Sequence, residues 1–170
     1  MAATSPVTLG PVGRPASLGV DLLHVRAWWR QLVEDVGSAR SVLVSTYMYD
    51  HQALTDKLLS RLRAGSEVCV LIDKESFQGK VPHRQKARLT ALEEKGAQVW
   101  LCTGPGPRGI HHKKGVVVDR RVAYVGGPNL TDKSENNGEQ CFRMCGPIVQ
   151  DIIEDFQSSK LLGKQWLPRG

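Results

Sequence analysis

One apolar segment of the chain, residues 110–119 (IHHKKGVVVD), carries two histidines and two lysines beside its valines. The valines predict a β-strand, in which successive side chains point to opposite faces. His112 and Lys114 then share one face, while His111 and Lys113 share the other. Because an unpaired buried charge is costly, a histidine and a lysine on one face of such a strand predict an anionic ligand.

Two groups downstream have residue types that suit the same chemistry. Gly126 and Gly127 precede Pro128 and Asn129, and glycines let a backbone approach a ligand closely while asparagine supplies amide donors. This turn is a candidate phosphate cradle. Farther along, an amide and a carboxylate, Asn137 and Glu139, open the next predicted strand. A carboxylate there could hold the second nitrogen of a histidine.

The spacing of these groups resembles the signature of the phospholipase D superfamily. His112-x-Lys114-x-x-x-x-Asp119, followed by Gly126-Gly127-x-Asn129, is similar to that family's HxKxxxxD and GSxN motifs. Upstream, SVLVSTYMYDHQALTDKLLSRLRAGSEVCVLID resembles the strand, helix and strand that precede the motif in small bacterial nucleases and mitochondrial cardiolipin hydrolase-like members. The resemblance covers the chain from about Trp28 to Trp166 and implies a layered α-β-α domain with a mixed central sheet.

The resemblance also implies roles for individual residues. His112 would be the nucleophile that attacks phosphorus and forms a phosphohistidine, which divides one difficult displacement into two. Lys114 and Asn129 would bind the non-bridging phosphate oxygens, and Glu139 would hydrogen-bond the histidine. Asp119 completes the motif, and we expect it to be an orienting or structural carboxylate.

The resemblance further implies a homodimer, because such enzymes use two histidines and this chain carries the motif once. A two-fold axis would bring both His112 side chains to one phosphate. No metal or other cofactor is expected, because lysines neutralise the charge that Mg²⁺ neutralises elsewhere. One departure is Gly127, which stands where serine or threonine is common. Pro128 has no backbone N–H, which leaves the Gly126 and Gly127 amides as the expected contacts.

Other candidates have weaker support from the sequence. His111 and Lys113 also match HxK, but Val118 stands where the motif requires aspartate, so we assign His111 no catalytic role. The basic segment that contains Lys80 and Arg84 is either a solvated helix face or a substrate-binding surface. The tryptophans are expected in the core or an interface rather than as base-stacking platforms; they are Trp28, Trp29 and Trp100.

Hydrophobic periodicity predicts the elements that must position these residues. Strands are expected at about Ser41–Met48, Val68–Ile72, Gln98–Cys102, His111–Val118, Val122–Val125 and Gly138–Cys145. Helices are expected at about Asp21–Ser38, Ala53–Leu62, a segment that ends near Gly96, and Ile148–Phe156. Val68–Ile72 should be central in the sheet, because its run has no polar alternation. The alternation of strands with helices predicts an α/β domain.

Composition limits the domain organisation and the partners. We expect a flexible lead-in over 1–20 and a single domain over 21–170, with no transmembrane segment. The formal net charge of +6 favours a polyanionic partner. The four cysteines, including Cys141 and Cys145, are expected to be buried thiols, while a disulfide or metal clip stays open. We expect a cytoplasmic protein, with mitochondrial association as the alternative, because no signal peptide is evident.

Three functions follow from this sequence. The first is a metal-independent nuclease of endonuclease type, a hydrolase that binds nucleic acid. The second is a phospholipase D or cardiolipin hydrolase that degrades phospholipid at a membrane surface, although no amphipathic anchor is evident at the amino terminus. The third is a non-catalytic scaffold of the same fold that binds nucleic acid.

Overall fold

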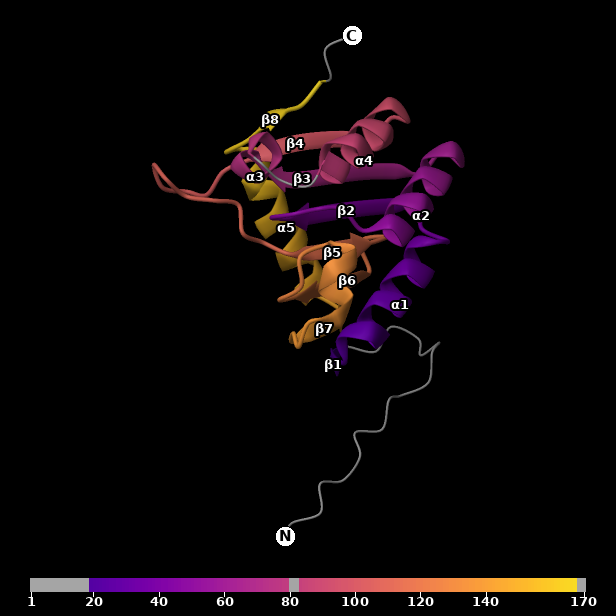
Figure 1. Ribbon diagram of the computed structural model, residues 1–170. Coiled ribbons are helices and arrows are strands. Elements are labelled where there is room, and N and C mark those ends of the chain that lie inside the picture. The colour runs from indigo at the N-terminus through magenta and orange to yellow at the C-terminus, as the bar shows by residue number, and fades with distance from the viewer. Residues whose placement is uncertain (1–18, 80–82, 168–170) are drawn as a thin grey trace.

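The computed structural model describes residues 19–79 and 83–167, and these residues form one mixed β-sheet with helices on both faces (Figure 1). The eight strands lie in the order β1-β7-β6-β5-β2-β3-β4-β8. The neighbours β2, β3 and β4 are parallel, and every other pair is antiparallel. In chain order the strands are β1 (Gly19–Leu23), β2 (Ser41–Thr46), β3 (Glu67–Asp73), β4 (Gln98–Cys102), β5 (Gly115–Val118), β6 (Val122–Gly126), β7 (Cys141–Cys145) and β8 (Lys164–Gln165).

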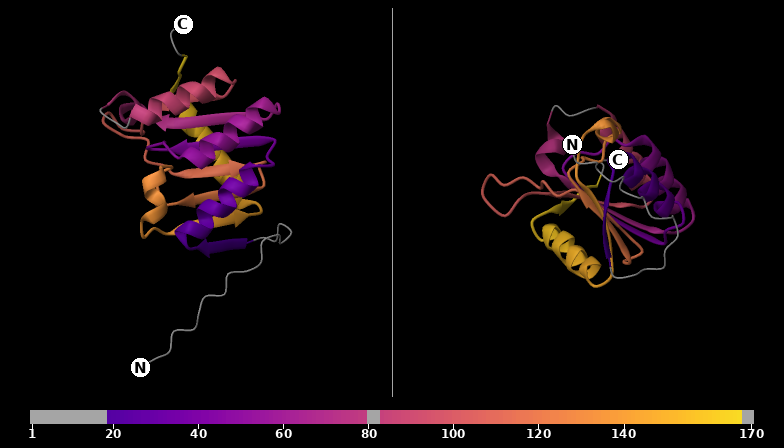
Figure 2. Two further views of the ribbon diagram at one scale, coloured as in Figure 1. Left: turned by 45° about the vertical axis from the view of Figure 1, so that its right-hand side comes forward. Right: turned by 90° about the horizontal axis from the view of Figure 1, so that it is seen from below.

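The helices form two layers around this sheet. Figure 2 shows α5 alone on one face of the sheet, with α1, α2 and α4 on the other. The helices are α1 (Val25–Val36), α2 (Gln52–Arg63), α3 (Lys74–Gln78), α4 (His83–Glu94), the 3-10 helix η1 (Asp132–Asn136) and α5 (Ile148–Lys160). The α/β class with a mixed central sheet is therefore confirmed, and so is the interior position of β3.

Each face of the sheet has its own hydrophobic core. On the α1 side, Trp28, Leu32 and Val36 follow the helical period and pack with Val42 and Val44 of β2. On the α5 side, buried side chains of that helix cover a smaller cluster that includes Leu71, Val117 and Ala123. Because neighbouring residues of β3 and β5 are buried on opposite faces, these strands read as continuous apolar runs.

The structure corrects three of the predicted boundaries. Residues 21–23 belong to β1, an edge strand paired with β7, rather than to the first helix. Val20 and Leu22 on that strand are largely exposed, so the edge lacks the burial pattern that marks an interior strand. The predicted strand from Gly138 begins at Cys141. The predicted lead-in overlaps β1 at residues 19 and 20, and its remainder lies outside the described residues.

The third correction concerns the segment with the two histidines. β5 begins at Gly115, whose pairing with Ser45 is the end of the ladder between β2 and β5. His112 and Lys114 therefore precede the strand. Before the strand, the backbone N–H of His111 donates to Oδ2 of Asp73 at 2.7 Å. No helix within the described residues has the length and apolar character needed to span a bilayer.

Candidate active site

The sheet register brings the predicted site residues to one edge. Ser45 near the end of β2 pairs with Gly115 at the start of β5, which pairs in turn with Val125 in β6. Gly126, the last residue of β6, pairs with Cys141 at the start of β7. The segments that precede β5 and β7 and the segment that follows β6 therefore meet at this edge. These segments carry His112 and Lys114, Glu139, and Gly127 with Asn129.

His112 and Lys114 lie together, as predicted from alternation. The ammonium of Lys114 is 2.9 Å from Nδ1 and 3.2 Å from Nε2 of His112, and it donates to the His112 carbonyl at 2.9 Å. Lys113 points the other way and forms an ion pair with Asp155 of α5 at 2.8 Å. His112 is exposed. An accessible imidazole beside an ammonium is a suitable arrangement for attack on an anionic phosphodiester.

His111 fixes the segment from behind. Its side chain is 3% exposed, and Nε2 lies 2.8 Å from the Ser45 hydroxyl. Burial, together with the nearby Lys113 ammonium, lowers the pKa of His111 to about 4 against the opposing charge of Asp73. His111 is therefore neutral at pH 7 and serves as a structural anchor, which agrees with its exclusion from catalysis.

This neutral histidine predicts a loss of stability in mild acid. The unfolded state takes up a proton near pH 6.5 that the folded state takes up only near pH 4, so the free energy of unfolding falls as pH decreases between these values. The slope from one such proton is at most about 1.4 kcal/mol per pH unit. Urea unfolding of the wild type and of His111→Asn between pH 7 and pH 4 measures it. We expect a shallower slope in the variant, and equal slopes would contradict this account.

Burial and Glu139 act on Lys114 in opposite directions. Burial lowers the pKa of Lys114, while the carboxylate of Glu139 raises it and so favours the charged ammonium. Among the described residues Glu139 forms no hydrogen bond with His112, which differs from the bond that the family resemblance implies. Lys114 occupies the imidazole nitrogens instead. Oε1 of Glu139 accepts from Nδ2 of Asn137 at 3.3 Å.

Gly127 lies against the carboxylate of Glu139. A Cβ added at Gly127 would displace Oε2 of Glu139, which is the end of a flexible side chain. The backbone N–H of Gly127 donates to the Gln140 carbonyl at 3.0 Å. That amide is therefore already bonded, which weakens the prediction that it contacts phosphate.

Asn129 completes the group with an unsatisfied amide. Its Nδ2 lies 3.9 Å from Sδ of Met48, which is a weak contact, and its Oδ1 is buried without a hydrogen-bond partner within the described part of the chain. Since assignment of oxygen and nitrogen in an amide follows its surroundings, one end of this side chain lacks a strong partner in either orientation. Such an amide is suited to an additional polar ligand.

One predicted site residue, Asp119, does not join this group. Asp119 lies after β5, at the opposite end of the strand from His112, and its Oδ1 accepts the backbone N–H groups of Arg40 and Ser41 at 2.7 and 2.9 Å. Its role there is structural, which was one of the two roles expected. Arg84 is exposed in the first turn of α4 and forms no ion pair within the described part of the chain, and Lys80 lies outside that part.

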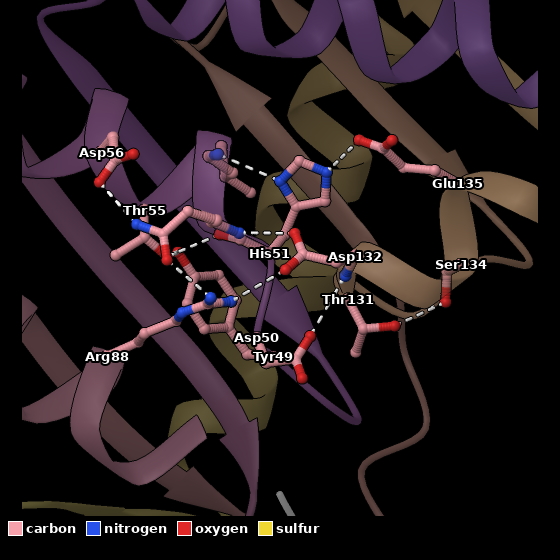
Figure 3. Close-up of polar contacts among 12 residues, drawn as sticks. Tyr49, Asp50, His51, Thr55, Asp56, Arg88, Thr131, Asp132, Ser134 and Glu135 are labelled. Carbon is pink, nitrogen blue, oxygen red and sulfur yellow. Dashed lines mark hydrogen bonds and ion pairs between the residues drawn. The ribbon is translucent and has the colours of Figure 1, made fainter. Parts of the chain in front are cut away.

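A polar network that sequence reasoning missed supports the loop between Asn129 and Glu139. His51, which is 1% exposed, caps α2 by accepting the Leu54 N–H, and its Nε2 lies 2.6 Å from Oε1 of Glu135 in η1. Figure 3 shows this imidazole between the α2 end and Glu135. Asp132 of η1 also accepts the backbone N–H of Gln52 at 2.8 Å. The network joins η1, in the middle of this loop, to the start of α2.

A second residue that the sequence analysis missed is Tyr47, directly after β2. Its ring centroid lies 4.8 Å from that of His112 with the planes inclined at 54°, and it lies 6.0 Å from the Lys114 ammonium. Tyr47 is partly exposed. Alternation beyond β2 could have indicated which face it shares, but its contact with His112 depends on the pairing of β2 with β5.

The four cysteines lie on strands of the sheet. All four are free thiols, and Cys102, Cys141 and Cys145 are buried while Cys69 is partly buried. Burial and, to a smaller extent, the Glu139 carboxylate together raise the pKa of Cys141 to about 11. Within the described residues no three side chains of His, Cys, Asp or Glu gather in a way that could hold a metal ion.

Comparisons with known proteins agree with this geometry. A family model described as "Cardiolipin synthase, PLD-like domain" matches residues 32–160. The fold is similar to Nuc from Salmonella typhimurium, a phospholipase D family member, with a TM-score of 0.74 and 18% identity over 87% of this chain and 97% of that chain. It is also similar to NucT from Helicobacter pylori, with a TM-score of 0.75 and 18% identity over 87% and 98% of the two chains.

A third similar structure is the phosphatidylserine synthase of Haemophilus influenzae Rd KW20, with a TM-score of 0.68 and 19% identity over 91% of this chain and 41% of that chain. A sequence search of curated proteins gave no match. At these identities the solved structures show a shared fold, while the family model covers most of the chain.

Proposed function

Because the chain belongs to the phospholipase D superfamily, we propose that it is a phosphodiesterase that hydrolyses nucleic acid through a nucleophilic His112. The observation that carries this proposal is the exposed His112 imidazole beside the Lys114 ammonium, at an edge that also holds Asn129. The formal net charge of +6 supports a polyanionic substrate. The resemblance of the upstream strand, helix and strand to those of small bacterial nucleases supports a nucleic acid as that polyanion.

The proposed reaction has two displacements at phosphorus. A ring nitrogen of His112 attacks the phosphorus, the bond to the leaving oxygen breaks, and the partner subunit's His112 donates a proton to that oxygen. Water then attacks the phosphohistidine, gives its proton to the partner subunit's His112, and the phosphorus–nitrogen bond breaks. Lys114 and Asn129 bind the non-bridging oxygens, where the lysine charge stabilises the charge that the transition state spreads over them.

Glu139 has a different proposed task from the one that the family resemblance implies. It favours the charged form of Lys114 against burial and receives a hydrogen bond from Asn137. When phosphate binds, Lys114 can exchange its bonds to the imidazole for bonds to phosphate oxygens. Such an exchange would free a ring nitrogen for attack while the carboxylate keeps the ammonium charged.

A phospholipid is the second candidate substrate. It is favoured by the matching family model, described as a cardiolipin synthase domain, and by the similarity to a phosphatidylserine synthase. The same histidine and lysine would act on either substrate, because both contain a phosphodiester.

The substrate class is tested by activity measurements with EDTA present. We expect cleavage of single-stranded DNA or RNA and of bis-(p-nitrophenyl) phosphate, because no metal takes part in the proposed steps. Release of phosphatidic acid from cardiolipin or phosphatidylcholine vesicles, without cleavage of nucleic acid, would assign the lipid function instead. Salt-sensitive nucleic-acid binding without any turnover would indicate the scaffold function.

A homodimer with a shared site makes a quantitative prediction. If each active site needs two His112 side chains, a dimer of one wild-type and one His112→Ala subunit is inactive. When the two forms are co-refolded in equal amounts and associate at random, activity per total protein should fall to about one quarter of the wild-type value. Independent sites would leave about one half of the wild-type activity. A protein that is monomeric in analytical ultracentrifugation, yet active under the same conditions, would contradict the shared site.

A further inference from the structure

Tyr47 is an aromatic side chain at the open edge of the site whose hydroxyl is unpaired. Within the described part of the chain, its phenol forms no hydrogen bond, whereas the hydroxyls of the buried tyrosines Tyr49 and Tyr124 bond to Thr55 and Asp35. The ring is partly exposed beside His112, at 4.8 Å between centroids. The fold thus leaves an aromatic face next to the proposed nucleophile instead of burying it in either core.

The imidazole has other support, so Tyr47 is not needed to hold it. Lys114 contacts both ring nitrogens of His112, and the backbone of the preceding residue, His111, is fixed by Asp73. His111 is anchored again at Ser45. These bonds determine where the imidazole lies. The Tyr47 ring adds a flat aromatic face, which hydrolysis of a phosphodiester does not itself require.

We propose that Tyr47 is a stacking subsite for the nucleobase adjacent to the scissile phosphate, which makes the enzyme specific for nucleic acid. This inference rests on the proposed phosphodiesterase function. A base next to a phosphate bound at His112 and Lys114 presents a flat π-face within reach of a side chain that already touches the imidazole. Aromatic stacking tolerates any sequence, because every base has such a face. A lipid phosphodiester has no ring there to stack.

The test compares one substrate that has a base at this place with one that lacks it. The substrates are a short single-stranded oligonucleotide cleaved at one phosphate and the same oligonucleotide with abasic sites on both sides of that phosphate. Tyr47→Leu removes the ring at similar bulk, and Tyr47→Phe is the matched control that keeps the ring and loses only the unpaired hydroxyl. Wild-type kcat and KM on both substrates give the reference.

The stacking subsite predicts an effect that depends on the base. Tyr47→Leu should lower kcat/KM on the intact oligonucleotide about tenfold, mainly through KM, as expected for a lost base–aromatic stack. On the abasic oligonucleotide the variant should match the wild type, and Tyr47→Phe should match it on both. Equal losses on both substrates would show that Tyr47 positions His112 and would overturn the inference.

Failure of the inference differs from failure of the proposed function. If wild-type protein cleaves neither oligonucleotide with EDTA present but hydrolyses a phospholipid, the nucleic-acid function fails and the subsite fails with it. If wild-type protein cleaves both and Tyr47→Leu does not alter their ratio, only the subsite fails. Circular dichroism and the thermal unfolding midpoint of Tyr47→Leu establish that the variant is folded.

Discussion

Replacement of His112 by alanine is expected to lower kcat for phosphodiester hydrolysis by at least about 10⁴-fold, because loss of a nucleophile removes the covalent route and not only a contact. The residual rate would come from phosphate binding by Lys114 and Asn129. Stopped assays at saturating substrate with EDTA present measure the effect. A loss below tenfold would assign the nucleophile to another residue.

The fold of this variant should be unchanged. His112 is exposed, and within residues 19–79 and 83–167 its side chain makes polar contacts with Lys114 alone, so its removal leaves neither hydrophobic core open. The thermal unfolding midpoint should therefore stay close to that of the wild type. When the wild-type protein is denatured without acid during turnover, a labelled oligonucleotide should remain covalently bound to it. No label should be bound to His112→Ala treated in the same way.

The local spacing of the motif predicts His112, Lys114 and Asn129 as site residues. Each lies at a fixed distance along the chain from a strand end, and the strands follow from apolar runs such as Val68–Ile72. Once the sheet order is set, antiparallel pairing brings the start of β5 and the end of β6 to one edge. Short-range patterns therefore predict most of what brings His112 and Lys114 to this edge of the sheet.

What the sequence did not predict depends on contacts between distant segments. Tyr47 lies beside His112 because β2 pairs with β5, and His51 meets Glu135 because η1 packs on α1 and α2. The edge strand β1 was missed because its apolar residues Val20 and Leu22 are largely exposed, so the strand does not follow the rule that apolar residues alternate toward a core. Asp119 matches the motif, yet the distance along β5 separates it from the imidazole and leaves it to bond the start of β2.

Lys114 and Lys113 offer the sharpest comparison within one segment. The two lysines are adjacent, but Lys114 contacts the imidazole while Lys113 pairs with Asp155 on the opposite side. Lys114→Met should lower kcat/KM about 10²- to 10³-fold, because it removes a cation from the charge that develops on the phosphate oxygens in the transition state. Steady-state kinetics on bis-(p-nitrophenyl) phosphate measure this loss.

Lys113→Met is the matched control, since it removes the same charge from the neighbouring position. Its ion pair with Asp155 is partly exposed, and exposed pairs contribute at most about 1 kcal/mol, so this variant should lose a little stability and almost no activity. Net charge falls equally in both variants, which separates the effect of a local cation from general attraction of a polyanion. Similar losses of activity in both would mean that the lysine charge acts at long range and that Lys114 does not bind the reacting phosphate.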